Sequence, residues 1–221
     1  MKSPIKNYGI ILASGVGSRF GSDFPKQFWK IDDKTILEHS IENFEKSEYI
    51  TDIIVVITPG FEDLAKKLIL KNSFKKVVKI INGGETRKDS SYIAVNSIDE
   101  EEANLLIHDC ARPFLSQRII KDCIKALENH SAVNVAIESS DTIVEIENNI
   151  IKKMPSRNNL RRSQTPQCFK LSLIKKAHEL SKNDSDFTDD CGLVFKHNLA
   201  DIYIVEGDIE NIKITYKTDL R

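Results

Sequence analysis

A turn rich in small residues follows the first apolar run of the chain and ends in a cation. Residues 13–19 read ASGVGSR, in which Ala13, Ser14, Gly15 and Gly17 leave room for backbone N–H groups to approach an anion closely. Arg19 adds a planar fork of donors that suits phosphate oxygens. The segment therefore predicts a loop that cradles phosphate groups.

This loop differs from the common nucleotide-binding motifs. No Gly-Lys-Ser/Thr follows it, and the third glycine of a dinucleotide fingerprint is missing, so P-loop hydrolysis and redox cofactor binding are disfavoured. Residues 25–28 read PKQF, in which Pro25 would keep the loop extended and present Lys26 to the same phosphates. The alternative is an ordinary surface loop with solvated cations.

A second Gly-rich segment stands between an expected strand and an expected helix. Residues 83–90 read GGETRKDS. Backbone groups at Gly83 and Glu85, together with the Ser90 hydroxyl, could read the edge of a pyrimidine base and exclude a purine. The alternative is a structural turn in which Ser90 is the N-cap of the next helix.

A third polar segment, HDCARP at residues 108–113, ends a strand on the side where open α/β sheets bind ligands. Asp109 could hold a divalent cation through oxygen ligation, and Arg112 could meet a phosphate. We expect His108 to be a packed, hydrogen-bonded histidine rather than a general base, since a phosphate nucleophile is already ionised at neutral pH.

Short apolar runs alternate with amphipathic segments along the chain, which predicts a doubly wound, mostly parallel α/β sheet. We expect strands at 8–13, 53–58, 77–81, 104–108, 134–137, 202–205 and 212–215, and helices at 34–46, 61–71, 89–98, 118–127, 171–180 and 191–195. No repeat, linker or low-complexity stretch divides residues 1–221, so we expect a single domain.

Alternating residues on either side of Asn148-Asn149 predict a β-hairpin, part of an arm at about 139–163. The arm has no covering helix of its own, so we expect a partner subunit to cover it.

Composition limits the partners of the chain. The 221 residues are 40% hydrophobic and 29% charged with a formal net charge of −1, so no bulk charge favours nucleic acid or an anionic membrane. The longest apolar runs are far shorter than the roughly 20 residues of a membrane helix, and we expect a soluble, cytoplasmic protein. The four cysteines include no C-x-x-C pair, which argues against a zinc site or a disulfide framework.

Taken in order, five segments resemble the cytidylyltransferases that make CDP-methylerythritol or CDP-ribitol. They are residues 12–19 with 25–28, 83–90, 108–113, 164–167 (QTPQ) and 211–215 (NIKIT). The resemblance implies a Rossmann-like fold on which CTP and a polyol phosphate give a CDP-polyol and pyrophosphate. It also implies Mg²⁺, or another divalent cation, and a homodimer whose arms are exchanged.

The resemblance also assigns roles. It implies that Arg19, Lys26 and Lys213 neutralise the phosphates, and that Asp109 binds the metal and the nucleotide. The other nucleotide-binding residues that it implies are Ala13, Ser14, Gly15, Gly17, Gly83, Glu85 and Ser90. The acceptor-binding residues that it implies are Arg112, Thr142, Arg157, Thr165 and Thr188, with Thr142 and Arg157 supplied by the neighbouring subunit.

The residues that distinguish enzymes for the two acceptors point in different directions. Val144 and residues 135–137 and 169–171 look more like the ribitol 5-phosphate enzymes, whereas Ala111 and Leu160 look more like the methylerythritol 4-phosphate enzymes. We favour ribitol 5-phosphate and keep methylerythritol 4-phosphate as the alternative. Some ribitol enzymes carry a reductase after this domain, so this chain is either naturally short or one part of a longer polypeptide.

Two other function classes stay open. A nucleotidyltransferase for a hexose 1-phosphate or a 3-deoxy sugar acid would share the Gly-rich loop, but it should lack the segments QTPQ and NIK. A catalytically silent binding module should have lost Arg19, Lys26, Asp109 or Lys213, all of which are present.

Overall fold

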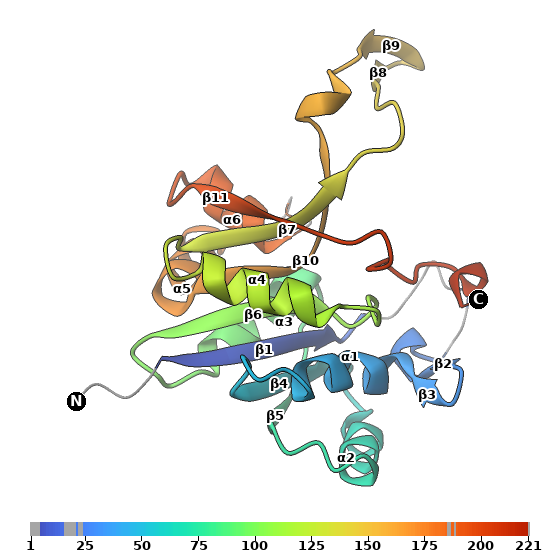
Figure 1. The fold of residues 1–221 in the computed structure, drawn as a ribbon, viewed down its shortest axis with the longest axis vertical. Helices are drawn as coiled ribbons and strands as arrows, with labels where there is room; N and C mark the ends of the chain where they lie inside the picture. The colour runs from blue at the N-terminus through green and yellow to red at the C-terminus, as the bar shows by residue number, and fades with distance from the viewer. Residues whose placement is uncertain (1–4, 16–20, 22–23, 185–186, 188, 221) are drawn as a thin grey trace.

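A seven-stranded sheet forms the centre of the molecule in the computed structural model, which describes residues 5–15, 21, 24–184, 187 and 189–220 (Figure 1). Its strand order is β11-β7-β10-β6-β1-β4-β5, and only β10 runs antiparallel to its neighbours. The strands are β1 Lys6–Ala13, β4 Asp52–Ile57, β5 Val77–Asn82, β6 Ala103–Asp109, β7 Ala132–Glu138, β10 Arg161–Lys170 and β11 Ile202–Glu206. The predicted α/β, mostly parallel class is confirmed.

Helices cover both faces of this sheet. Two separate clusters of buried apolar side chains form the core, one beneath α1, α2 and α4 and the other beneath α3, α5 and α6. The helices are α1 Ile36–Glu45, α2 Glu62–Lys71, α3 Arg87–Asn96, α4 Gln117–Ala126, α5 Leu171–Leu180 and α6 Asp190–Lys196. This double covering explains why the central strands are continuously apolar. None of the described helices is both long and apolar enough to cross a membrane.

Capping boxes fix the starts of the two helices nearest the carboxyl edge of the sheet. Thr35 and Glu38 cap α1 reciprocally, and Thr86 and Asp89 do the same for α3. The capping alternative for Ser90 is therefore wrong, because α3 begins before Ser90 and Thr86 is its N-cap.

One predicted strand is absent, and one strand of the central sheet was not predicted. Residues 212–215 form no strand: the Ile214 N–H donates to the Ala111 carbonyl, but the N–H groups of Thr215 and Tyr216 donate to the Asp219 carboxylate instead. Strand β10 was missed because residues 161–167 are all polar except Pro166. Its register shifts between Ser163 and Gln167, and this irregularity accommodates the proline.

A hairpin arm leaves the end of β7 and stands away from the body (Figure 1). Its strands are β8 Glu145–Glu147 and β9 Ile150–Lys153, and both turn residues, Asn148 and Asn149, have positive φ angles of 51° and 62°. Such a turn matches the twist of a hairpin, so the predicted hairpin is confirmed. The remaining short elements are η2 Lys26–Phe28, β2 Lys30–Ile31, β3 Lys34–Thr35, η3 Arg157–Asn159 and η4 Lys217–Asp219.

Candidate active site

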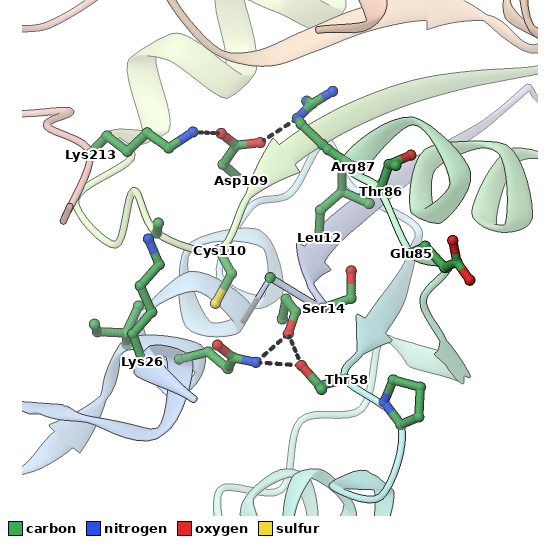
Figure 2. A pocket seen from close by; sticks show the side chains of 17 residues that line it. Leu12, Ser14, Lys26, Thr58, Glu85, Thr86, Arg87, Asp109, Cys110 and Lys213 are labelled. Atoms are coloured by element: carbon green, nitrogen blue, oxygen red, sulfur yellow. Dashed lines mark hydrogen bonds and ion pairs between the residues drawn. The ribbon is translucent and has the colours of Figure 1, made fainter. Parts of the chain in front are cut away.

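A cavity of about 370 Å³ opens at the carboxyl edge of the sheet, where β1 and β6 end side by side. The chain leaves these two strands in opposite directions across the sheet, and such a switch point is the usual ligand site of open α/β folds. Lys26 and Lys213 line one side of the cavity and Glu85 and Thr86 the other, with Asp109 above (Figure 2). The cavity size suits a small organic ligand.

The end of β1 is held in place by side chains from three other elements. Gln27, on η2, is buried and donates from Nε2 to the Ala13 carbonyl at 2.6 Å and to the Thr58 hydroxyl at 2.9 Å. The hydroxyls of Ser14 and Ser90 lie 2.7 Å apart. The first half of the Gly-rich loop is thus fixed before any ligand arrives.

Lys26 reaches the cavity from η2, directly after Pro25. Its Nζ donates to the Ile214 carbonyl at 3.0 Å. The rings of Phe24, Phe28 and Phe61 lie within 6 Å of one another, with centroid distances of 5.7, 5.8 and 5.4 Å, and anchor this turn to the start of α2. The local sequence therefore places the amine of Lys26 at the cavity wall.

Asp109 is the acidic centre of the site. Its Oδ1 lies 2.9 Å from Arg87 Nε and its Oδ2 lies 2.6 Å from Lys213 Nζ. Burial alone would raise the pKa of Asp109, but the two cations outweigh it and hold the pKa well below its usual range. Asp109 is therefore ionised at any physiological pH.

His108 is packed under Asp109 and does not face the cavity. It is fully buried, its Nε2 lies 2.9 Å from the Arg112 carbonyl and its Nδ1 lies 3.0 Å from the Thr165 hydroxyl. Burial lowers the pKa of His108 to about 4, so the ring is neutral, and Nε2 donates to the carbonyl. The expectation of a packed histidine agrees with this geometry.

Thr165 and Arg112 lie beside the cavity and do not line it. The buried Thr165 hydroxyl accepts from the Asp109 N–H at 3.1 Å, so it orients the backbone of that residue. Arg112 donates from Nη1 to the Asn211 carbonyl at 2.8 Å, and its buried Nε has no partner among the described groups.

The second Gly-rich segment borders the cavity opposite the lysines. A Cβ on Gly83 would lie 2.2 Å from the Ser14 Cβ, so only glycine fits there. The buried Ser90 hydroxyl contacts Ser14 and the Gly84 N–H, and it donates to the Thr86 carbonyl at 3.0 Å. Ser90 therefore holds the backbone of this cavity wall in place without lining the cavity itself.

The structure separates the arm residues from the cavity of the same chain. Thr142 is exposed, and Arg157 contacts the Ser140 carbonyl at 3.3 Å and lines a different groove at the base of the arm. Of the predicted site residues, Ala13, Ser14, Gly15, Lys26, Glu85, Asp109 and Lys213 line the cavity. Gly17, Arg19 and Thr188 lie outside the described residues.

The cavity lining also includes Gln27, Thr58, Arg87 and Cys110, which were not predicted as site residues. Gln27 and Arg87 lie inside two motifs already recognised, PKQF and GGETR. Their place in these motifs could have identified them as site residues. Thr58 follows a strand whose neighbour β1 ends in the same place, but that pairing is not visible in the sequence. Burial raises the pKa of the Cys110 thiol to about 12, which makes it unreactive.

The donor set around Asp109 fits a divalent cation that is held mainly by substrate. Among the described side chains, no group of three or more His, Cys, Asp or Glu could hold a metal ion. Mg²⁺ is commonly bound through one or two carboxylates plus substrate phosphates, so one carboxylate beside a phosphate pocket is sufficient. Asp109 is the residue that would hold it.

Relatives of known name match almost the whole chain. A protein of Haemophilus influenzae named bifunctional ribulose 5-phosphate reductase/CDP-ribitol pyrophosphorylase is 42% identical over 97% of this chain, which covers 47% of that protein. The chain thus spans about half the length of this relative. The 2-C-methyl-D-erythritol 4-phosphate cytidylyltransferase of Thermosipho melanesiensis is 40% identical over 97% of the chain and 94% of its own length.

Solved structures are similar over nearly the whole chain. The 4-diphosphocytidyl-2C-methyl-D-erythritol synthase of Anaerococcus prevotii has a TM-score of 0.86 at 28% identity and covers 98% of this chain and 93% of its own. The Francisella tularensis 2-C-methyl-D-erythritol 4-phosphate cytidylyltransferase has a TM-score of 0.81 at 31% identity, over 97% and 96% of the two chains. The profile of the 2-C-methyl-D-erythritol 4-phosphate cytidylyltransferases matches residues 8–221, and the chain belongs to this family of cytidylyltransferases.

Proposed function

We propose that this chain transfers CMP from CTP to a polyol phosphate, favouring ribitol 5-phosphate, and releases pyrophosphate. The observation that carries the proposal is a cavity with Lys26 and Lys213 on one side and the second Gly-rich segment, residues 83–90, on the other. Asp109 lies between these two sides. Positive side chains around a rigid backbone cradle suit a triphosphate, and the family membership identifies the nucleotide as CTP.

In this mechanism an oxygen of the acceptor phosphate attacks the α-phosphorus of CTP as the bond to pyrophosphate breaks. The acceptor is already ionised, so no general base is needed, and the neutral, buried His108 is not required to act as one. Catalysis consists of positioning and charge stabilisation. Lys26 and Lys213 neutralise the charge that builds on the phosphoryl oxygens.

Asp109 is the residue proposed to hold Mg²⁺, which would neutralise part of the phosphate charge when bound. In the ligand-free geometry both oxygens of Asp109 are engaged by cations. A divalent cation would compete most readily for Oδ2, because its partner Lys213 has a side chain that is 39% exposed.

Ribitol 5-phosphate is the favoured acceptor on two grounds. The Haemophilus relative named for CDP-ribitol is 42% identical across nearly the whole chain. Val144 on the arm and residues 135–137 and 169–171 also look more like the ribitol enzymes.

Methylerythritol 4-phosphate is the second candidate. The matching family profile and the Thermosipho relative, at 40% identity, carry that name. Ala111 and Leu160 also look more like the enzymes that use this substrate.

One assay separates these candidates. Pyrophosphate release is measured with CTP and Mg²⁺ against ribitol 5-phosphate and methylerythritol 4-phosphate side by side. We expect kcat/KM to be at least tenfold higher for ribitol 5-phosphate. The reverse preference would replace the favoured acceptor, and release with neither would overturn the proposed acceptor class.

We also propose that the chain acts as a homodimer in the cytoplasm, where its phosphorylated substrates are made and retained. The arm exposes a set of large apolar side chains, which a second copy would cover: Ile143, Val144, Ile146, Ile150, Ile151 and Met154. Thr142 and Arg157 would then reach the acceptor in the partner's cavity.

A further inference from the structure

A buried ion-pair network lies behind the cavity. Arg87, the first residue of α3, contacts two carboxylates: its Nε lies 2.9 Å from Asp109 Oδ1 and its Nη1 lies 2.7 Å from Asp190 Oδ2. Asp109 borders the cavity, whereas Asp190 does not, and the Asp190 side chain is only 1% exposed. Arg87 therefore connects the site to a second carboxylate, that of Asp190, which is buried away from the cavity.

The carboxylate of Asp190 is held firmly from the other side. Its Oδ1 accepts from the Ser91 hydroxyl at 2.5 Å. Gln167, on β10, accepts from the N–H groups of Asp190 and Cys191 at 2.8 and 3.2 Å and fixes the start of α6. Asp190 is thus a preorganised anchor for the guanidinium of Arg87.

Ser91, His178 and Asp190 together resemble a nucleophilic triad in composition, but their arrangement does not permit that chemistry. The Ser91 hydroxyl donates to the carboxylate, and the His178 Nε2 lies 3.2 Å from the Ser91 oxygen. All three residues are at most 3% exposed, so no substrate can reach the hydroxyl. The cluster acts on the site only through Arg87.

The two oxygens of Asp109 are held unequally. Oδ1 is paired with Arg87, which is itself fixed by Asp190 and has a side chain only 24% exposed. Oδ2 is paired with Lys213, which is 39% exposed and lies on a segment outside any helix or strand. An exposed amine on irregular backbone yields to a ligand more readily than a doubly paired guanidinium.

We propose that Asp190 is a positioning residue for CMP transfer. It keeps Arg87 on Oδ1 of Asp109, so that Oδ2 remains the oxygen offered to the substrate side and the Arg87 guanidinium stays at the cavity wall instead of moving toward the triphosphate. This inference rests on the proposed function. It assigns no catalytic contact to Asp190 itself.

The test uses the nearly isosteric variant Asp190→Asn, which removes the charge that holds Arg87. Binding of Mn²⁺, as a spectroscopic substitute for Mg²⁺, is titrated by electron paramagnetic resonance with CTP present and acceptor absent. We expect the Mn²⁺ affinity to fall by about tenfold or more, as for other outer residues that orient a metal ligand. With acceptor added, kcat should fall by a similar factor while KM for the acceptor stays within about twofold.

The matched control is Asp189→Asn, at the neighbouring position. It removes the same charge at the same helix start, but Asp189 contacts Gly192 and Gln167 and not Arg87. We expect Asp189→Asn to keep the wild-type Mn²⁺ affinity. Equal losses in both variants would show a general effect of charge or helix stability and would overturn the proposal.

A folded Asp190→Asn protein with wild-type Mn²⁺ affinity and kcat would also overturn it. If Asp190→Asn does not fold, Asp190→Glu decides: it keeps the charge but displaces the carboxylate, and it must show the same split between kcat and KM. The binding measurement needs no acceptor. Wild-type protein that binds Mn²⁺ and CTP but releases no pyrophosphate would therefore count against the proposed function alone.

Discussion

Two lysines approach the cavity from opposite ends of the sequence, and their surroundings differ. Lys26 stands on a 3-10 turn anchored by aromatic rings, with its amine on the Ile214 carbonyl. Lys213 is paired with Asp109. The two amines are thus held at the cavity wall by different groups, Lys26 by a backbone carbonyl and Lys213 by a carboxylate.

Replacement of Lys26 by alanine should lower kcat for pyrophosphate release by about 100- to 1000-fold, because a preorganised positive charge at the phosphoryl oxygens is lost. The circular dichroism spectrum and the melting temperature should stay close to those of the wild type. Lys30→Ala, at an exposed position nearby, is the control and should retain full activity. Near-normal turnover of Lys26→Ala would remove this lysine from the mechanism.

Acid should destabilise the protein through His108. The imidazole of His108 takes up a proton near pH 6.5 in the unfolded chain but only near pH 4 in the folded chain. The stabilisation is therefore complete above pH 6.5 and is lost as the pH falls. Within that window each pH unit should cost up to about 1.4 kcal/mol. Urea unfolding at pH 7.5 and 5.5 measures this loss. His108→Gln keeps an N–H for the Arg112 carbonyl but does not titrate, and an equally steep loss in that variant would contradict the assignment.

At the scale of single residues, site residues that lie within sequence motifs could be predicted. Contacts between residues that lie far apart along the chain could not. Lys26 and Asp109 were predicted from the segments PKQF and HDCARP, and Lys213 from the resemblance of NIKIT to the family. The second partner of Arg87 was not, since Asp190 lies 103 residues away at the start of another helix. Distance along the chain carries no signal for such a pair.

Among the elements, α1 packs directly on β1, the strand that precedes the Gly-rich loop. A Cβ on Gly9 of β1 would lie 2.4 Å from Cδ1 of Phe44, and the Ser40 hydroxyl donates to the Cys110 carbonyl at 2.7 Å. The helix therefore locks the ends of β1 and β6 at the spacing that the cavity requires.

Gly9→Ala should lower the free energy of unfolding by about 1–3 kcal/mol, because the ring of Phe44 has no space to retreat in a packed core. Chemical denaturation of the two single variants and of Gly9→Ala/Phe44→Leu forms a double-mutant cycle. We expect the smaller leucine to relieve part of the clash, so that the double variant is less destabilised than the sum. Strict additivity would mean that the two side chains do not compete for space.

The sheet illustrates where sequence patterns succeed and fail at this scale. The parallel strands were predicted because helices bury both of their faces, which leaves uninterrupted apolar runs. Strand β10 reads as a loop because residues 161–167 are polar or proline, yet it pairs with both β6 and β7. Polar and apolar side chains alternate in residues 212–215 as they do in a strand. Ile214 is buried, but the segment forms no strand.

At the scale of the whole molecule, the arm carries a cluster of exposed large apolar side chains. Replacing Ile146 and Ile150 together by aspartate should convert a dimer into a monomer, because two charges would have to be buried at the proposed interface. Light scattering coupled to size exclusion gives the mass directly. The substitution Leu70→Asp, at a still more exposed apolar position on α2, is the control and should leave the mass unchanged. A wild-type protein that is monomeric at micromolar concentration would refute the proposed dimer.

Sharing of the site between two subunits can be tested by complementation. Arg157→Ala and Lys26→Ala damage different parts of one composite site, so heterodimers should contain one site with neither substitution. Mixed after reversible dissociation, the two inactive variants should recover up to about a quarter of wild-type activity, from statistical assortment of the two chains. Recovery that is absent despite verified heterodimers would assign Arg157 to its own subunit.

The hydrogen bond from Lys26 to the Ile214 carbonyl joins residues 188 positions apart. During translation, the Gly-rich loop and its lysine leave the ribosome long before the residues that complete the cavity. A nascent chain therefore has no finished site until residues 213 and 214 have emerged, and closing such long-range contacts is among the slowest steps of folding. Nucleotide capture should accordingly begin only after the ribosome has released these two residues.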